Sequence, residues 1–145
     1  MNAPASPFGH LSSIERVVEL HGASIEAYGG LHNAPKDGCI ESALGNAWTA
    51  EGYREKNEYD VDGLTFASSL LLYLAIAHCF GDGNKCVAWA ALCDVLLKLG
   101  LTLDVGDDEA ESFVLQVATG ATRDRGEVID WVADRLAALP EATST

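Results

Sequence analysis

The residues with the clearest chemical potential lie together in one short stretch, His78-Cys79-Phe80-Gly81-Asp82-Gly83-Asn84-Lys85. An imidazole can take a proton from an attacking hydroxyl, and a carboxylate can hold a magnesium ion. A lysine offers a mobile positive charge to phosphate oxygens. A histidine, a carboxylate, an asparagine and a lysine crowded around a glycine-rich bend therefore indicate phosphate chemistry.

Helical sequence flanks this stretch on both sides. Apolar residues fill the segment 64–77 before the histidine, and a second such segment, 87–99, follows the lysine. The first N–H groups of a helix have no partner within that helix and lie at its positive end, so a phosphate can bind there. Gly81 and Gly83 remove side chains where the backbone must bend. From the residues alone, an ordinary helix–loop–helix corner with solvated polar side chains is the alternative.

The order His-x-Phe-x-Asp-Gly-Asn-Lys resembles the active-site motif of the Fic/Doc superfamily. The lysine directly after the asparagine is similar to the death-on-curing (Doc) branch, because members that transfer AMP usually carry glycine there. The resemblance extends to Gly29-Gly30, to the segment 36–44 and to the segments 67–77 and 88–100. It implies an all-α fold, with a single compact Fic/Doc-like helical domain of about six helices.

Carried over position by position, the resemblance implies catalytic roles for His78, Asp82 and Lys85. His78 would be the base that activates a target hydroxyl, and Asp82 would bind magnesium or orient the nucleotide. The implied cofactors are ATP and Mg²⁺. The phosphate-binding residues would be Gly83, Asn84, Lys85 and Cys86.

The Doc branch transfers a phosphoryl group from ATP to a threonine of elongation factor Tu, which stops translation. The resemblance therefore implies a toxin of a toxin–antitoxin pair, with a target protein such as this elongation factor and a cognate antitoxin as partners. Fic proteins often carry an inhibitory helix with the pattern Ser/Thr-x-x-x-Glu-Gly/Asn. The sequence contains no such pattern, so we expect a separate antitoxin to neutralise the protein.

The sequence departs from the family at Cys86, where the motif continues with arginine. An arginine grips phosphate with a planar fork that cysteine cannot imitate, and losing such a contact costs roughly 1.5–3 kcal/mol. Cys86 therefore supports an alternative, a degenerate domain that binds nucleotide or protein without efficient turnover. A protein nucleotidyltransferase (AMP transfer) is a further alternative, and Lys85 argues against it. Lys36, Arg54 and Lys56 are candidates to supply the missing charge, since the family places their segments near the site.

Composition narrows the possible partners. The formal net charge of −13 opposes direct binding to nucleic acid, because phosphate neutralisation needs lysine and arginine. No apolar run approaches the roughly 18 residues of a membrane span, and the first residues do not read as a signal peptide, so we expect a cytoplasmic protein. The four cysteines form no Cys-x-x-Cys pair, so we expect reduced thiols and no structural zinc.

Residues 1–11 read as an N-terminal arm and residues 12–140 as the helical domain. Ser12 with Glu15 forms a predicted capping box for the first helix, which ends at Gly29-Gly30. Further helices are predicted at 38–48, 63–77, 84–99, from residue 107 and at 125–139, with a short extended segment at 101–105. His21, on the apolar face of the first helix, reads as a core histidine more readily than as a catalytic one.

The predicted core and one predicted loop complete the organisation. The last helix should bury Val128, Trp131, Val132 and Leu136. The centre of the core should comprise Leu71, Leu74, Ala88, Leu92, Val95 and Leu99. The polar segment 49–62, with Tyr53 and Tyr59, reads as an exposed loop, and the resemblance implies a flap that docks the target segment by backbone pairing.

Overall fold

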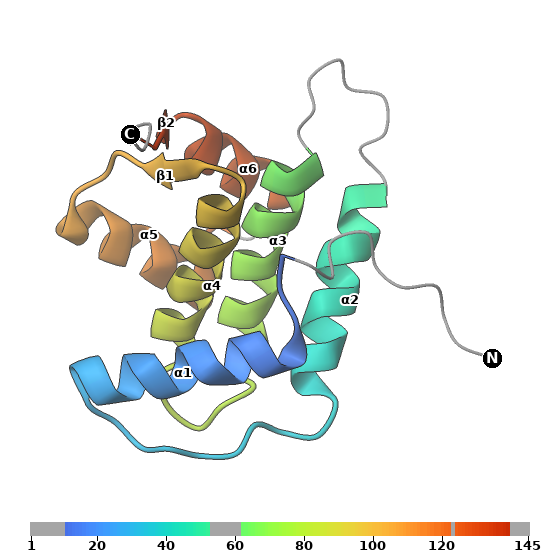
Figure 1. The fold of residues 1–145 in the computed structure, drawn as a ribbon, viewed down its shortest axis with the longest axis vertical. Helices are drawn as coiled ribbons and strands as arrows, with labels where there is room; N and C mark the ends of the chain where they lie inside the picture. Colours follow the sequence, from blue (N-terminus) through green and yellow to red (C-terminus); the bar gives the residue numbers. More distant parts are fainter. Residues whose placement is uncertain (1–10, 53–61, 123, 140–145) are drawn as a thin grey trace, which may run out of the picture.

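The computed structural model describes residues 11–52, 62–122 and 124–139, and of residues 49–52 and 62 it describes the backbone alone. Six helices and one small sheet account for these residues, so the predicted all-α class is confirmed (Figure 1). The elements are α1 (Ile14–Tyr28), α2 (Cys39–Gly52), α3 (Asp62–Ala77), α4 (Asn84–Lys98), β1 (Leu101–Leu103), α5 (Asp107–Thr119), α6 (Arg125–Ala133) and β2 (Leu136–Ala138).

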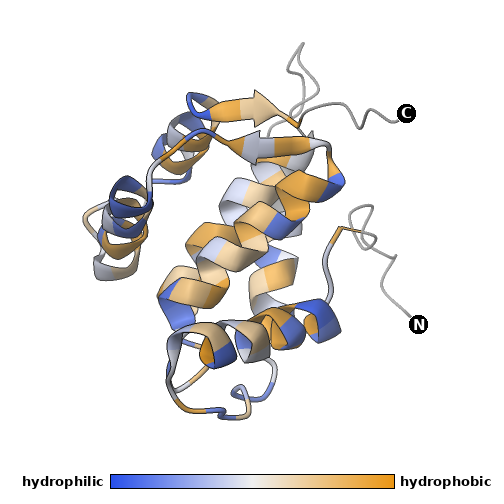
Figure 2. Ribbon diagram, turned by 60° about the vertical axis from the view of Figure 1, so that its left-hand side comes forward, coloured by the Kyte–Doolittle hydropathy of each residue, from blue (hydrophilic) through white to orange (hydrophobic). Residues whose placement is uncertain are grey.

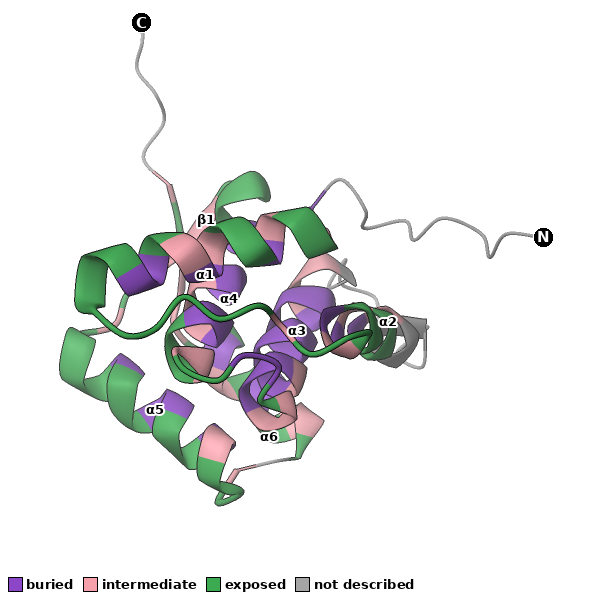
Figure 3. Ribbon diagram, turned by 90° about the horizontal axis from the view of Figure 1, so that it is seen from below, coloured by how far each residue is buried: buried purple, intermediate pink, exposed green. Residues whose placement is uncertain are grey.

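The helices α3 and α4 run side by side through the middle of the molecule (Figure 1). The helix α1 crosses one end of this pair, and the two-stranded sheet lies at the opposite end. The helices α2, α5 and α6 pack around α3. A helix enclosed in this way is buried on most sides and needs mainly apolar residues. The central helices are mostly pale or orange in Figure 2, and α3 is purple over most of its length in Figure 3.

The core forms mainly where apolar periodicity predicts it. Five of the six predicted central residues, Leu71, Leu74, Ala88, Leu92 and Val95, are buried. Leu99 is the exception at 37 % exposure. The helix α4 ends one residue before it, at Lys98, so Leu99 is a cap whose side chain lies against Gly63 at the start of α3.

The predicted last helix, 125–139, is wrong in its second half. The helix α6 ends at Ala133, and β2 pairs antiparallel with β1, with Leu103 opposite Leu136. Two further backbone bonds, from Asp104 N to Arg135 O (2.8 Å) and from Leu139 N to Gly100 O (3.1 Å), extend this ladder. Leucine and alanine favour helix locally, so here the long-range pairing overrides the local propensity.

Two other helix ends differ from the prediction. The first helix is capped by Ser13, whose hydroxyl accepts from Arg16 N, and not by Ser12. Ser12 is instead buried. The helix α2 continues past Trp48 to Gly52, because a polar sequence without proline can extend a helix that is already anchored. The predicted end of the first helix at Gly29, with φ of +91°, is confirmed.

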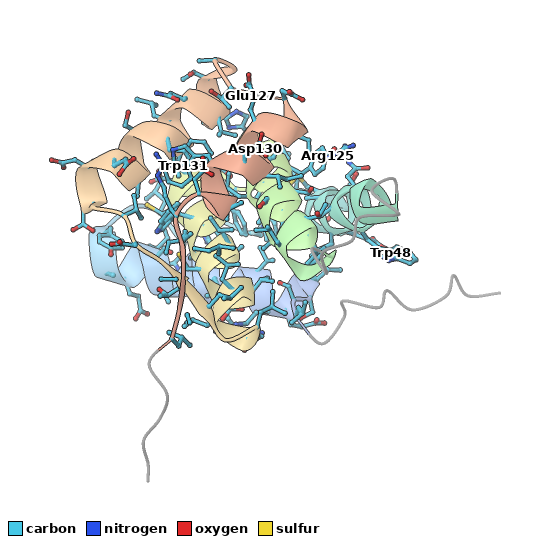
Figure 4. All side chains as sticks on the ribbon, turned by 90° about the horizontal axis from the view of Figure 1, so that it is seen from above. Trp48, Arg125, Glu127, Asp130 and Trp131 are labelled. Atoms are coloured by element: carbon cyan, nitrogen blue, oxygen red, sulfur yellow. A yellow bond between two sulfur atoms is a disulfide. The ribbon has the colours of Figure 1, made fainter. Side chains whose placement is uncertain are left out.

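The last helix presents two different faces (Figure 4). Trp131 lies on the side that meets α5, where its ring stacks on Phe113 at 3.8 Å and lies under the guanidinium of Arg135. Glu127 and Asp130, on the same helix, are exposed. Stacked rings and a cation over the ring add to the area that is buried, so this aromatic cluster fixes α6 on the domain.

An ion-pair cluster fixes α1 across α4. The guanidinium of Arg16 contacts both carboxylate oxygens of Asp94, at 3.1 and 2.7 Å, and the ammonium of Lys98 lies 3.2 Å from the same carboxylate. Burial on its own raises the pKa of Asp94, but the hydrogen bonds from Arg16 and Lys98 outweigh it and hold that pKa below its usual range. The charged form of Asp94 therefore stabilises the fold.

We expect Asp94→Asn to lower the free energy of unfolding at neutral pH by about 1.5–3 kcal/mol, the range for hydrogen bonds to charged groups. The folded pKa lies below the unfolded value of about 3.9. The contribution is therefore complete above the unfolded pKa and is lost as the pH falls through the folded pKa. Urea unfolding at pH 7 and pH 3 should show the difference between parent and variant shrinking in acid.

The matched control for Asp94 is Glu19, which also pairs with Arg16 at 3.0 Å but has a side chain 66 % exposed. Exposed pairs contribute little, so Glu19→Gln should change the free energy of unfolding by less than about 0.5 kcal/mol. Equal losses from the two variants would contradict the assignment of the cluster to Asp94.

Candidate functional site

The loop between α3 and α4, which contains the motif, lies at the end of the molecule that α1 crosses (Figure 1). The segment between α1 and α2 runs alongside this loop when the molecule is seen from below (Figure 3). Two hydrogen bonds join the segments, one from Leu31 N to the side-chain Oδ2 of Asp82 (3.1 Å) and one from Lys36 N to the backbone oxygen of Cys79 (2.9 Å). The predicted site is therefore built from the residues 78–86 with the residues 29–36 beside them.

The side-chain amide of Asn84 closes the loop. Its Oδ1 accepts from Phe80 N at 2.9 Å, and its Nδ2 donates to Phe80 O at 2.7 Å. Both hydrogen-bonding groups of the amide are thus engaged with one backbone residue. The side chain of Asn84 therefore clamps the loop, and its predicted contact with phosphate stays a prediction.

His21, on α1, contacts the loop and holds it in place. It is 3 % exposed, its ring stacks on Phe80 with centroids 3.7 Å apart, and its Nε2 lies 2.7 Å from Asp82 O. A carbonyl oxygen only accepts, so Nε2 carries the proton and donates it. The interpretation of His21 as a satisfied core histidine is confirmed, and the residue holds the motif in place from α1.

Two glycines allow the close approach of these segments. Gly83 has φ of +78°, and a Cβ there would lie 3.0 Å from Ile25 and 3.2 Å from the ring of His21. Gly30 has φ of +122°, and a Cβ there would lie 2.7 Å from the carboxylate of Asp82. Side chains rarely adopt these backbone conformations, so both positions require glycine for conformation as well as for space.

The carboxylate of Asp82 is exposed and partly engaged. Its Oδ1 accepts from Gly83 N at 2.9 Å and its Oδ2 from Leu31 N at 3.1 Å. Each oxygen keeps a lone pair, and magnesium commonly binds through one carboxylate together with substrate phosphates and water. The described residues contain no group of three or more His, Cys, Asp or Glu side chains that could hold a metal alone. Asp82 thus fits a magnesium ion that arrives with a nucleotide.

The start of α4 offers three backbone donors. The N–H groups of Asn84, Lys85 and Cys86 have no hydrogen-bond partner among the described residues, because the first bond of the helix runs from Val87 N to Gly83 O. The first turn carries no acidic residue, and Lys85 and Cys86 are exposed. Free amides, a positive helix end and an exposed ammonium together fit an anion.

His78 lies directly between the end of α3 and the loop. His78 is exposed. Its φ of +52° makes it the single non-glycine residue with positive φ in the described part of the chain. The left-handed conformation turns the chain sharply out of the helix, so that Cys79 and Phe80 enter the core. The predicted base therefore lies one residue before the anchored part of the loop.

The expectation of four reduced thiols is wrong in this structure, because Cys39 and Cys79 form a disulfide with Cα atoms 5.4 Å apart. The two residues are 40 positions apart in sequence, and no spacing pattern marks the pair. They meet because α2 packs along α3, which places the first residue of α2 beside the last turn of α3. Cys86 and Cys93 are free, and burial raises the pKa of Cys93 to about 11.

Three cations are candidates to replace the family arginine. Of these, Lys36 lies beside the motif, because its backbone N–H binds the backbone oxygen of Cys79. Its side chain is exposed. Arg54 and Lys56, together with Tyr53 and Tyr59 of the predicted flap, fall within residues 53–61, outside the described residues. The predicted loop 49–62 is wrong at both ends, because residues 49–52 belong to α2 and Asp62 begins α3. Lys36 is thus the candidate that the structure brings to the site.

Sequence reasoning missed the contacts that hold the site from outside the motif. The N–H of Leu31 orients the carboxylate of Asp82, and the disulfide holds Cys79. Neither contact is marked by a periodic pattern in the sequence. Gly29-Gly30 was the one available indication, since a glycine pair after a helix marks a close approach of backbone.

Comparison with known proteins identifies the family of this chain. The model of the Fic/DOC family matches residues 11–96, which is more than half of the chain and includes α1 to α3, the whole motif loop and α4 as far as Leu96. The protein therefore belongs to the Fic/DOC family, whose domains are typically transferases that use ATP with Mg²⁺. A search of curated proteins finds no match.

No helix in the described segments is both long enough and apolar enough to cross a membrane.

Proposed function

We propose that this protein is a Doc-like toxin that transfers a phosphoryl group from ATP to a hydroxyl of a target protein. The observation that carries the proposal is the start of α4, where three N–H groups have no partner among the described residues and Lys85 is exposed, on the same loop as His78. Phosphate chemistry needs positioning and charge neutralisation more than covalent help, and these groups supply both.

In the proposed reaction, His78 accepts the proton of the target hydroxyl as its oxygen forms a bond to the γ-phosphorus. The bond from that phosphorus to the bridging oxygen of ADP breaks, and ADP leaves with the electron pair. Lys85 and the amides of α4 balance the charge on the phosphates. Asp82 would hold Mg²⁺, which supplies further charge neutralisation.

The partners follow from the same proposal. The target would be a protein of the translation machinery, such as elongation factor Tu, and a separate antitoxin would neutralise the toxin. We propose a cytoplasmic location and no direct action on nucleic acid, in keeping with the net charge of −13. A small antitoxin gene beside the coding sequence would support this proposal.

The second candidate is a degenerate domain that binds nucleotide without efficient turnover, and Cys86 favours it. This residue is exposed in the first turn of α4, where the family motif has arginine. AMP transfer is a third candidate, and the ammonium of Lys85 occupies space that glycine leaves open in relatives with that activity.

ATP labelled separately at the α- and γ-phosphorus separates the three candidates. Incubation with Mg²⁺ and purified elongation factor Tu should move the γ-label to the protein and leave the α-label in solution. Transfer of the α-label would establish AMP transfer instead. Binding of ATP with transfer of neither label, to this target or to proteins of a cell extract, would favour the degenerate domain.

We expect Cys86→Arg to raise ATP affinity or the transfer rate by about tenfold or more. The arginine adds a bidentate phosphate ligand at the start of α4, and about 1.4 kcal/mol corresponds to a factor of ten. Calorimetry with Mg²⁺ and ATP measures the first quantity and the γ-label measures the second. Cys86→Gln, which adds length without charge, is the matched control and should give no comparable gain. A loss of both binding and activity in Cys86→Arg would show that the site has a different shape.

A further inference from the structure

We propose that the Cys39–Cys79 disulfide positions His78, so that reducing it lowers the rate of transfer without weakening ATP binding. Cys79 would thus be a positioning residue of the site and the disulfide a redox control. This inference rests on the proposed function of the same site.

The part of the loop that receives phosphate is held without the disulfide. Asn84 clamps Phe80, His21 donates to Asp82 O and stacks on Phe80, and Leu31 N binds the carboxylate of Asp82. None of these contacts involves a cysteine. The free amides at the start of α4 should therefore keep their geometry when the disulfide opens.

The backbone of His78 depends on different anchors. On its N-terminal side α3 ends at Ala77, and on its C-terminal side Cys79 is held by the disulfide and by the bond from Lys36 N to Cys79 O. His78 itself has φ of +52°. A side-chain-bearing residue in the left-handed region stays there only while its surroundings fix it. Opening the disulfide removes the covalent anchor of Cys79, leaves its buried position and the bond from Lys36 N, and lets His78 relax.

The disulfide is reachable from one side. Cys79 is 2 % exposed, whereas Cys39, at the start of α2, is only partly buried. A dithiol reductant can attack the sulfur of Cys39, so that the S–S bond breaks and Cys79 leaves as a thiolate. The second thiol of the reductant then releases Cys39, and the reductant becomes a disulfide while the protein gains two electrons and two protons.

The direction of the control follows from these contacts. In the oxidised protein His78 is held in place and transfer proceeds. In the reduced protein, the form that a reducing cytoplasm favours, the base leaves its position, so transfer would respond to oxidation. Displacing a reacting group by about 1 Å can cost up to a hundredfold in rate. We expect kcat to fall by at least about tenfold on reduction, while KM for ATP changes by less than about twofold.

The test uses the full chain, oxidised and then treated with dithiothreitol. Alkylation under denaturing conditions should label the two free cysteines before reduction and all four after it. The γ-label gives kcat and KM in each state, and proton–carbon NMR follows the imidazole of His78. Cys39→Ser should match the reduced parent and no longer respond to dithiothreitol. Cys93→Ser, which removes a partly buried free thiol, is the matched control and should respond as the parent does.

The readouts separate failure of this inference from failure of the proposed function. Protection of two cysteines, with a shift of the His78 resonances on reduction, supports the positioning role even if neither state transfers phosphate. Alkylation of all four cysteines in the untreated protein overturns it. So does an equal activity of Cys39→Ser and the oxidised parent, or a fall in ATP affinity that parallels the fall in rate.

Discussion

Replacing His78 should abolish transfer while the fold and ATP binding remain. A positioned general base contributes about 10²- to 10⁴-fold to the rate, and His78 is exposed directly after α3, on the loop that leads to the free amides of α4. We therefore expect His78→Ala to lower kcat for transfer of the γ-label by a factor in this range, with loss of toxicity in a growth assay. Affinity for ATP should change by less than about twofold.

The φ of +52° at His78 makes a second variant necessary. Alanine fits the left-handed region less well than asparagine does, so a defect of His78→Ala could come from a shifted loop. His78→Asn keeps the backbone conformation and removes the base. Circular dichroism should show both variants folded. A folded His78→Asn as active as the parent would end the assignment of His78 as base.

The fold could be predicted to the extent that local signals determine it. Apolar residues at helical spacing locate the six helices, and glycines mark ends such as the one after Tyr28. The strand β2 could not be predicted in this way, because residues 136–138 pair with residues 101–103 and nothing local records that partner. The misplaced cap at Ser12 has a similar cause, since two adjacent serines offer the same side chain and packing selects Ser13.

The candidate site could be predicted as a location and as a set of chemical groups, because its members are contiguous in sequence. What each group does could not be read in the same way. His21 and Leu31 contact the loop across 61 and 51 positions, and the disulfide spans 40. These contacts decide which polar atoms remain available to a ligand, and the motif alone does not contain them.

Asn84 and Lys85 show this difference most directly, and only one of the two substitutions should lower the free energy of unfolding. The two residues are adjacent at the start of α4, and the sequence predicts a phosphate contact for both. In the structure the amide of Asn84 is fully engaged with Phe80, at 2.9 and 2.7 Å, while the side chain of Lys85 is exposed.

We expect Asn84→Ala to lower the free energy of unfolding by about 2–6 kcal/mol, because it leaves the N–H and C=O of Phe80 without partners in a partly buried loop, at about 1–3 kcal/mol each. Affinity for ATP should fall with it, since the loop that shapes the amides is no longer closed. Urea unfolding and calorimetry with Mg²⁺ and ATP measure the two quantities on the same samples.

Lys85→Ala should leave the free energy of unfolding within about 0.5 kcal/mol of the parent. It should weaken ATP binding by roughly 10- to 150-fold, the equivalent of one charge-assisted contact of about 1.5–3 kcal/mol. Lys85→Arg keeps the charge and should restore most of the affinity. Unchanged affinity in Lys85→Ala would move the nucleotide away from this helix end. If Asn84→Ala lost ATP affinity at an unchanged free energy of unfolding, its amide would contact phosphate directly, and the clamp on Phe80 would not be its main role.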